Sequence, residues 1–315
     1  MDSHNHNQDH GHGHDHVPGD IKGRRFVLSI ALTGLIFVAE VVGGLLTGSL
    51  ALLSDAAHVF LDALALGLSY GALRLAALPP NERHTYGYHR LQVVAALING
   101  ATLLLVSVEI FREAWERFAN PSPVLAGPML IVAVVGLVVN LVVALVLGGH
   151  DHRDLNVHSA FLHVVGDALA SVGVIVAGVI ILFTGWTWVD PIVGMLIAVI
   201  ILINSGRVLR RSLHILVEGM PGDMTASAVA ETMNEVAGVT KVHDLHVWTL
   251  GPGYIALSAH VVLDDQALSQ TEEIMDELKT VLSEEFDIEH TTIQFECSAC
   301  TPGDFLCRID EVPAD

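Results

Sequence analysis

The chain has 315 residues, of which 52% are hydrophobic and only 16% are charged, which is too apolar for an ordinary water-soluble domain. Its formal net charge of −20 argues against nucleic acid as a partner and is compatible with cations nearby. We therefore expect a membrane protein.

Six stretches are apolar over about 20 residues, the length that a helix needs to cross the ~30 Å hydrocarbon core of a bilayer. Lipid offers the backbone no hydrogen-bond partners, so each stretch is predicted to be a helix. The stretches cover residues 26–46, 50–73, 91–111, 126–147, 158–183 and 189–208.

The predicted fold class is a membrane α-helical bundle of six transmembrane helices with a C-terminal cytosolic α+β domain. We place a disordered His-rich cytosolic tail at residues 1–25, the bundle at 26–211 and the acidic cytosolic domain at 212–315. Ten Lys and Arg residues in the connections near the membrane fall on one side, against Arg112 and Arg117 on the other. Because cytosolic loops carry the excess of Lys and Arg, we expect a multi-pass protein of the cell membrane with both termini in the cytosol.

The second and fifth apolar stretches each carry a histidine and an aspartate four residues apart. The pairs are His58 with Asp62 and His163 with Asp167. Residues at i and i+4 lie on one face of a helix, so each pair presents an imidazole and a carboxylate one turn apart. A lone intramembrane histidine is commonly a hydrogen-bond partner between helices, but the repeated pair favours a shared cation.

Two imidazole nitrogens and two carboxylate oxygens make a complete tetrahedral shell, which suits zinc. The set lacks a thiolate, so copper(I) fits it poorly, and imidazole suits Zn, Co, Ni or Fe better than Mg or Ca. A full shell leaves no position for a catalytic water, and the H-E-x-x-H motif of metalloproteases is absent. We therefore expect a protein that binds or moves a divalent metal and is not an enzyme.

Three further polar residues lie within apolar stretches. Asp55 and Asn140 either orient the metal ligands or make hydrogen bonds between helices. Glu40 is close to the outer end of the first stretch, where it either sits near water or lies on the path by which the cation enters.

Four motifs resemble those of the cation diffusion facilitator family, closest to its zinc-transporting branch. They are GSLALLSDAAHVFLD, YGYHRLQVVAALING, NVHSAFLHVVGDALASVGV and WVDP, which are similar to the family's second, third, fifth and sixth helix motifs. The resemblance implies that His58, Asp62, His163 and Asp167 are the transport ligands. His58 places the chain with the zinc-selective members, and cadmium remains an alternative cargo. The resemblance also implies a homodimer that exports zinc from the cytosol in exchange for protons.

Imidazole chemistry supports such an exchange, because a group with an ordinary pKa of about 6.5 binds either a proton or a metal ion. The alternative is a membrane-embedded divalent-metal sensor or receptor, which would hold its metal permanently. A cation channel is a weaker alternative, because it needs weak successive sites and not a tight cage.

The loop NERHTYGYHRLQ contains two candidate ligands, His84 and His89. The family often has a further metal site in this loop. Tyr88 and Gln92 stand where other members place a ligand and a glutamate, so we expect a weak site or none. Solvated histidines in a polar loop are an equal alternative.

The cytosolic region has helical patterns at residues 225–236 and 269–286 and strand patterns at 239–250, 254–263 and 291–296. This small α+β domain resembles the family's metallochaperone-like dimerisation domain. The resemblance selects His243, His260, His290 and Glu296 as ligands of a regulatory zinc site. His246 is three residues from His243, and such residues face opposite sides of a strand unless the strand is bulged.

Cys297 and Cys300 form a C-x-x-C pair, which supplies half of a tetrahedral thiolate site. Cytosolic thiols are normally reduced, so we expect no disulfide. A partner for the pair could come from the N-terminal tail, which contains HNHNQDHGHGHDH. Alternatively, the tail binds metal loosely without a defined site.

Overall fold

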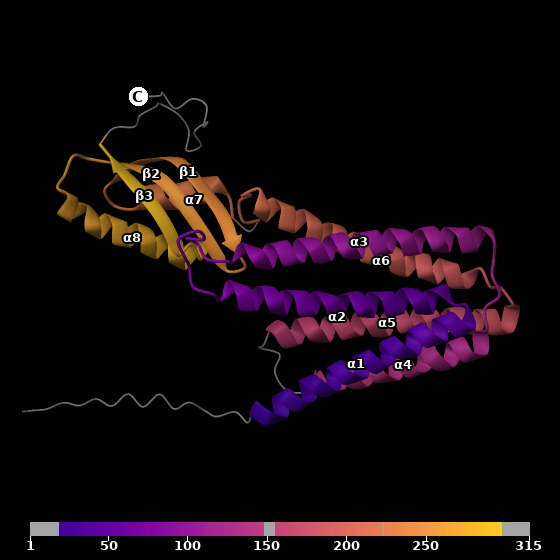
Figure 1. The fold of residues 1–315 in the computed structure, drawn as a ribbon. Helices are drawn as coiled ribbons and strands as arrows, with labels where there is room; N and C mark the ends of the chain where they lie inside the picture. The colour runs from indigo at the N-terminus through magenta and orange to yellow at the C-terminus, as the bar shows by residue number, and fades with distance from the viewer. Residues whose placement is uncertain (1–18, 148–154, 223, 298–315) are drawn as a thin grey trace, which may run out of the picture. The chain divides into compact units, whose positions relative to one another are not determined.

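The computed structural model describes residues 19–147, 155–222 and 224–297, without the side chains of residues 19–30, 144, 146–147 and 155–164. Six long helices come first along the chain (Figure 1). They are α1 (Gly19–Thr47), α2 (Leu50–Ala76), α3 (Arg90–Ala119), α4 (Ala126–Leu147), α5 (Leu155–Thr184) and α6 (Val189–Leu216). The C-terminal domain follows with α7 (Ala226–Glu235), β1 (Val239–Gly251), β2 (Tyr254–Leu263), α8 (Leu268–Phe286) and β3 (His290–Glu296).

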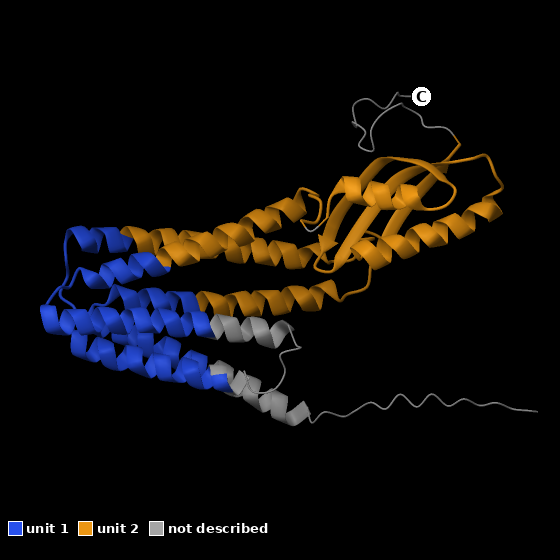
Figure 2. Cartoon of the chain, turned by 180° about the vertical axis from the view of Figure 1, so that it is seen from behind, with its two compact units in different colours: residues 1–59, 113–197 blue, residues 60–112, 198–315 orange. Residues whose placement is uncertain are grey.

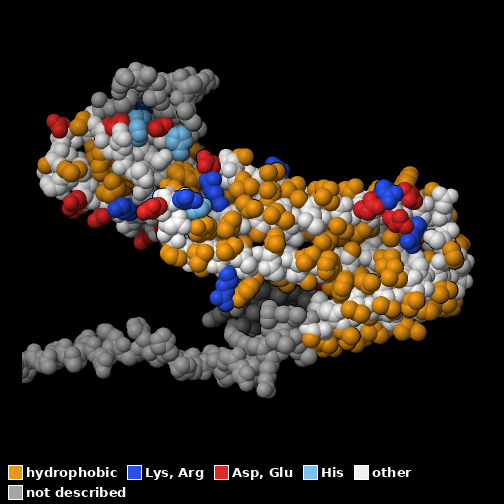
Figure 3. All heavy atoms as spheres, in the orientation of Figure 1, with side chains coloured by type: hydrophobic (Ala, Val, Ile, Leu, Met, Phe, Trp, Pro, Cys, Tyr) orange, Lys and Arg blue, Asp and Glu red, His pale blue; other side chains and the backbone are white. Residues whose placement is uncertain are grey.

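Within the described residues, five helices, α2 to α6, are long and apolar enough to cross a membrane, and α1 adds a shorter apolar stretch at Ala31–Thr47. Large hydrophobic side chains such as Leu105, Ile131 and Phe183 are exposed on these helices, where lipid would cover them. On the face drawn in Figure 3, hydrophobic side chains cover the long helices and charged side chains are sparse between the helix ends. The chain is therefore a multi-pass membrane protein, and the fold class predicted from the sequence is confirmed.

The chain divides into two compact units, which are coloured separately in Figure 2. Unit 1 consists of residues 1–59 and 113–197, and unit 2 consists of residues 60–112 and 198–315. Unit 1 contains α1, α4 and α5 with the beginnings of α2 and α6. Unit 2 contains most of α3, the remainder of α2 and α6, and the C-terminal domain.

Glycines let the helices of unit 1 approach one another closely. α4 packs against both α1 and α5. A Cβ atom at Gly43 would lie 2.7 Å from Val132 Cγ2, and one at Gly178 would lie 2.8 Å from Leu130 Cγ. Small residues at such positions allow helix backbones to pack together in a membrane. This packing fixes α5, which carries Asp167, against α4.

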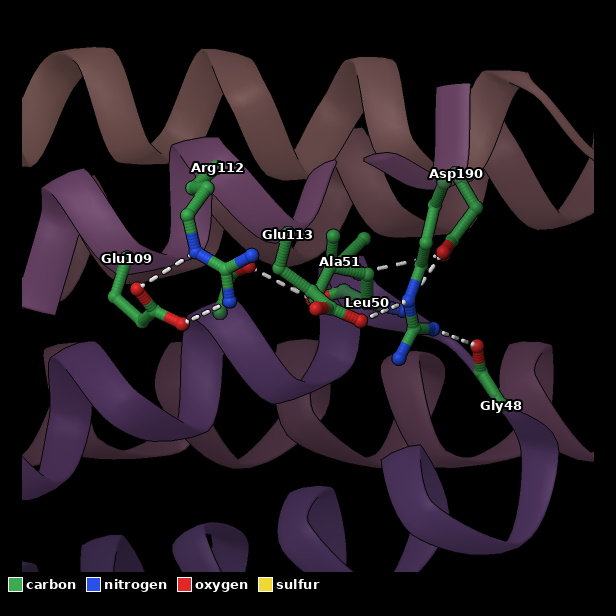
Figure 4. Close-up of polar contacts among 9 residues, drawn as sticks. Gly48, Leu50, Ala51, Glu109, Arg112, Glu113 and Asp190 are labelled. Atoms are coloured by element: carbon green, nitrogen blue, oxygen red, sulfur yellow. Dashed lines mark hydrogen bonds and ion pairs between the residues drawn. The ribbon is translucent and has the colours of Figure 1, made fainter. Parts of the chain in front are cut away.

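The beginning of α2 is held by an aspartate from α6 (Figure 4). Asp190 accepts hydrogen bonds from the Ser49 hydroxyl at 2.5 Å and from the backbone amides of Leu50 at 2.7 Å and Ala51 at 3.3 Å. The first amides of a helix have no acceptor within the helix, and negative charge is favourable beside them. Asp190 therefore caps α2 from a different helix and fixes the end of the helix that carries His58.

Arg117, near the end of α3, holds the same corner of unit 1. Its guanidinium donates to the carbonyl oxygen of Gly48 at 2.7 Å and to the carboxylate of Glu113 at 2.8 Å. Gly48 has a φ of 72°, a conformation that glycine adopts without strain. The turn between α1 and α2 is therefore tied to both α3 and α6.

The C-terminal domain is built on a three-stranded sheet with the strand order β1-β2-β3. β1 and β2 are antiparallel, and β3 runs parallel to β2. The core between the sheet and the helices α7 and α8 contains Met233, Leu257 and Leu282, all fully buried. The second face of the sheet, which carries the histidines described below, lies opposite this core.

β1 contains one extra residue between His243 and His246. His243 pairs with His260 and His246 pairs with Ser258, so three steps along β1 match two steps along β2. Asp244 lies in this bulge and has a φ of 50°. Side chains along a strand normally point to alternate faces of the sheet. The extra residue in the bulge shifts this pattern by one, so His243 and His246 face the same side of the sheet.

Candidate functional site

α2 and α5 bring two of the predicted transport ligands together within unit 1. His58 Nε2 lies 3.8 Å from Asp167 Oδ1, and Asp167 is buried. Ligand atoms at about 2.0 Å from a tetrahedral zinc are separated by about 3.3 Å, so a small closing movement would let both bind one ion. The nitrogen and the oxygen come from two different membrane-spanning helices.

The other two predicted ligands lie one helical turn from this pair. Asp62 follows His58 on α2, on the same face of the helix. His163 precedes Asp167 on α5, but its side chain lies outside the described residues. Both stay predictions as metal ligands, whereas His58 and Asp167 are placed together.

Polar residues that the sequence placed in the apolar stretches are enclosed by protein. Glu40 is 1% exposed, Asp55 is 2% exposed and Asn140 is also buried. The alternative that Glu40 sits near water is therefore wrong. Its position near the end of the first apolar stretch suggests contact with water, but the helices of unit 1 enclose the side chain.

A second cluster lies on the sheet of the C-terminal domain. Glu296 Oε2 lies 3.0 Å from His243 Nε2, and Glu296 Oε1 lies 2.9 Å from His260 Nδ1. Each of the three residues offers one ligand atom, and these atoms lie within 4.8 Å of one another. The Nδ1 atom of His243 is buried without a hydrogen-bond partner. Two imidazoles and a carboxylate in this arrangement fit a zinc ion with one position left open.

Asp244 extends this cluster, and sequence reasoning missed it. Its carboxylate lies 3.1 Å from His246 Nε2 and 3.7 Å from His260 Nε2. A carboxylate beside the second nitrogen of a metal-binding histidine holds the ring in orientation. The position depends on the bulge in β1, which has no signal in the sequence of a single strand.

His290 lies away from the cluster, which corrects the predicted set of four. It begins β3 and pairs with Ala256, six residues before Glu296, a separation of about 20 Å along a strand. Its ring contacts Tyr86, with the centroids 5.3 Å apart. The structure brings together three of the four predicted residues.

The two loop histidines make aromatic contacts in unit 2. The ring of His84 lies 4.5 Å from that of Tyr88, and the ring of His89 lies 4.0 Å from that of Tyr254. Both histidines line a cavity of about 1090 Å³ next to β1. Among the described residues they join no group of metal-ligating side chains.

The thiol of Cys297 is free and exposed. Cys300 and residues 1–18 of the tail lie outside the described residues. The predicted pairing of this C-x-x-C motif with the tail therefore stays a prediction.

The sequence matches the cation efflux transmembrane domain over residues 26–217 and the cation efflux protein cytoplasmic domain over residues 221–298. The chain belongs to the cation efflux family. This cation efflux protein is 40% identical over 291 residues to the metal cation efflux system protein CzcD of Cupriavidus metallidurans, with 92% of each chain covered.

Two further relatives of this cation efflux protein are similar over most of their length. The cadmium, cobalt and zinc/H(+)-K(+) antiporter of Bacillus subtilis is 42% identical over 287 residues, which cover 90% of this chain and 92% of the relative. The zinc transporter ZitB of Escherichia coli is 38% identical over 302 residues, with 94% of each chain covered. Membership of the cation efflux family agrees with the expectation of a metal transporter.

The cluster of His243, His260 and Glu296 in this cation efflux protein can be tested with two histidine variants. We expect His260→Ala to lose about one bound zinc ion per chain, because it removes one of the three candidate ligands that the chain brings together. His290→Ala should keep that ion and serves as the control. The check is the zinc content of the purified full chain after dialysis against a weak chelator. Equal loss in both variants would mean that the ligand set is wrong.

Proposed function

We propose that this cation efflux protein is a secondary transporter that exports zinc from the cytosol in exchange for protons. The observation that carries the proposal is the meeting of His58 and Asp167 on two membrane-spanning helices. Imidazole with carboxylate is a donor set suited to zinc and poorly suited to Mg or Ca. The names of the relatives include zinc transport and exchange with protons, and two of them extend to cadmium and cobalt or to metal cations in general.

The exchange follows from competition for the same atoms. Zinc needs a neutral imidazole and ionised carboxylates, so protons that bind His58 and Asp167 expel the metal. Protons arriving from the outside release zinc there, and loss of these protons to the cytosol restores the site. The hydrogen bonds from the first residues of α2 to Asp190 fix that end of the helix, and the part of α2 that carries the ligands can move about it.

We place the protein in the cell membrane with both termini in the cytosol, as a homodimer. α7 and α8 cover one face of the sheet, and the opposite face carries His243, His260 and Glu296. A second copy on that face would supply the open position of a zinc ion bound there. Zinc at this cluster would act as a regulatory ion that reports the cytosolic concentration.

Zinc flux in sealed vesicles tests the proposal against a metal sensor. The full chain is reconstituted, a pH gradient is imposed, and zinc is followed with a dye enclosed in the lumen. We expect zinc to move toward the acidic side and to reverse when the gradient is reversed. Binding of zinc without movement under either gradient would reject transport.

A further inference from the structure

Two buried carboxylic acids of unit 1 have no role among the metal ligands. Glu40 on α1 and Asp55 on α2 are almost completely enclosed, at 1% and 2% exposure. Glu40 Oε2 and Asp55 Oδ1 are buried without a hydrogen-bond partner. A buried carboxylate in this situation must be paired with a cation or neutralised by a proton.

The charges around Glu40 do not supply that cation. Asp55 and Asp167 lie close enough to Glu40 to repel its negative charge, and Asp167 acts on Asp55 in the same way. The nearby imidazole, His58, faces Asp167. The sequence of α4, which packs against α1, contains no titratable residue.

Arg117 is the one Lys or Arg whose side chain is described in unit 1, and it is engaged elsewhere. It binds the carbonyl oxygen of Gly48 and the carboxylate of Glu113 at the end of α3. The described interior of unit 1 therefore contains four buried carboxylates and a single imidazole, and one of these carboxylates, Asp190, is already used as the cap of α2.

α4 makes room for the carboxylate of Glu40. A Cβ atom on Gly136 would lie 3.1 Å from Glu40 Oε1 and 3.8 Å from Ser171 Oγ. Glycine at this position lets the carboxylate approach the α4 backbone, beside a hydroxyl oxygen. The helices α1, α4 and α5 thus meet beside the carboxylate of Glu40.

We propose that Glu40 and Asp55 form a separate binding site for a monovalent counter-cation, a proton or an alkali ion, close to the metal ligands. Their donors are all oxygens, which suit protons and hard cations, whereas zinc favours the nitrogen and oxygen donors at His58 and Asp167. Zinc at the ligands repels the counter-cation, and departure of zinc makes its return favourable. The inference rests on the proposed exchange and names where the returning ion is held.

Flux measurements with Glu40→Gln test the site, because the amide keeps the shape and removes the charge. Vesicles are given either a pH gradient without alkali ions or a K⁺ or Na⁺ gradient at equal pH. One of these gradients should drive zinc flux in the wild type. Under that gradient, we expect the zinc flux of the variant to be at least about tenfold lower than that of the wild type. Zinc affinity, measured by calorimetry with His243→Ala in the background, should stay within about threefold of the wild type.

The two gradients identify the ion. Loss of pH-driven flux alone assigns a proton, and loss of alkali-driven flux alone assigns an alkali ion. Unchanged flux under both gradients overturns the site, and so does a fall in zinc affinity that matches the fall in flux, since Glu40 would then be a metal ligand. A wild type that moves no zinc would instead reject the proposed transport.

Gly136→Ala provides a second test of the site, because it changes the space around Glu40 and leaves every charge in place. The added methyl group would crowd Glu40. The zinc flux driven by the counter-cation gradient should therefore fall, as expected in Glu40→Gln. Gly127→Ala, also on α4, adds a methyl group where no atom lies within 4 Å and serves as the matched control. Wild-type coupling in Gly136→Ala together with wild-type coupling in Glu40→Gln would contradict the proposal.

Discussion

Replacing Asp167 with asparagine should lower zinc export by at least about 100-fold, because the amide cannot supply the anionic oxygen that zinc binds. Asparagine matches aspartate in size, so the packing of α5 against α4 should survive. Zinc flux in reconstituted vesicles measures the loss, and thermal unfolding in detergent confirms that the variant is folded.

The exposed Asp265 of the C-terminal domain offers a matched control. Asp265→Asn makes the same chemical change away from the membrane helices and should export zinc at the wild-type rate. If Asp167→Asn also kept a rate within about threefold of the wild type, the pair of His58 and Asp167 would not be the transport site.

Replacing Asp190 with alanine should destabilise the protein by about 2–4 kcal/mol, because a helix cap is lost and three buried donors are left without an acceptor. Those donors are the Ser49 hydroxyl and the amides of Leu50 and Ala51. Because the same helix carries His58, zinc flux should fall by at least about tenfold even where the variant is folded.

Asp190→Asn separates capping from charge. The amide oxygen can still accept hydrogen bonds, so this variant should be more stable than Asp190→Ala in thermal unfolding. Asp264→Ala, at an exposed position of the C-terminal domain, controls for loss of an aspartate. Equal unfolding temperatures for Asp190→Ala and the wild type would show that the cap does not hold α2.

Local signals in the sequence were enough for the helices and for singling out His58 and Asp167, which the structure places together. The length of an apolar stretch predicts a membrane helix directly, and the spacing of His58 and Asp62 already places both on one face of α2. The depth of Glu40 could not be read in this way. Its burial depends on α4, where Gly136 leaves room for the carboxylate.

The cluster on the sheet of the C-terminal domain could not be predicted in full from residue types alone. His290 and Glu296 belong to one strand and were assigned to one site, but their six-residue separation places them at opposite ends of β3. The contribution of Asp244 depends on the bulge opposite His260, which arises only when β1 pairs with β2. Pairing between strands is a tertiary property, so neither result could be reached from one strand alone.

X-ray absorption spectroscopy of the zinc-loaded protein tests most directly whether α2 and α5 share one metal ion. The protein for this measurement lacks residues 2–18 and carries His243→Ala, His260→Ala and Glu296→Gln, so that the tail and the cluster of the C-terminal domain hold no zinc. We expect a four-coordinate shell of two imidazole nitrogens and two carboxylate oxygens at about 2.0–2.2 Å. A shell that contains sulfur, a six-coordinate shell of oxygens alone, or an unchanged spectrum in Asp167→Asn would contradict a zinc site shared by the two helices.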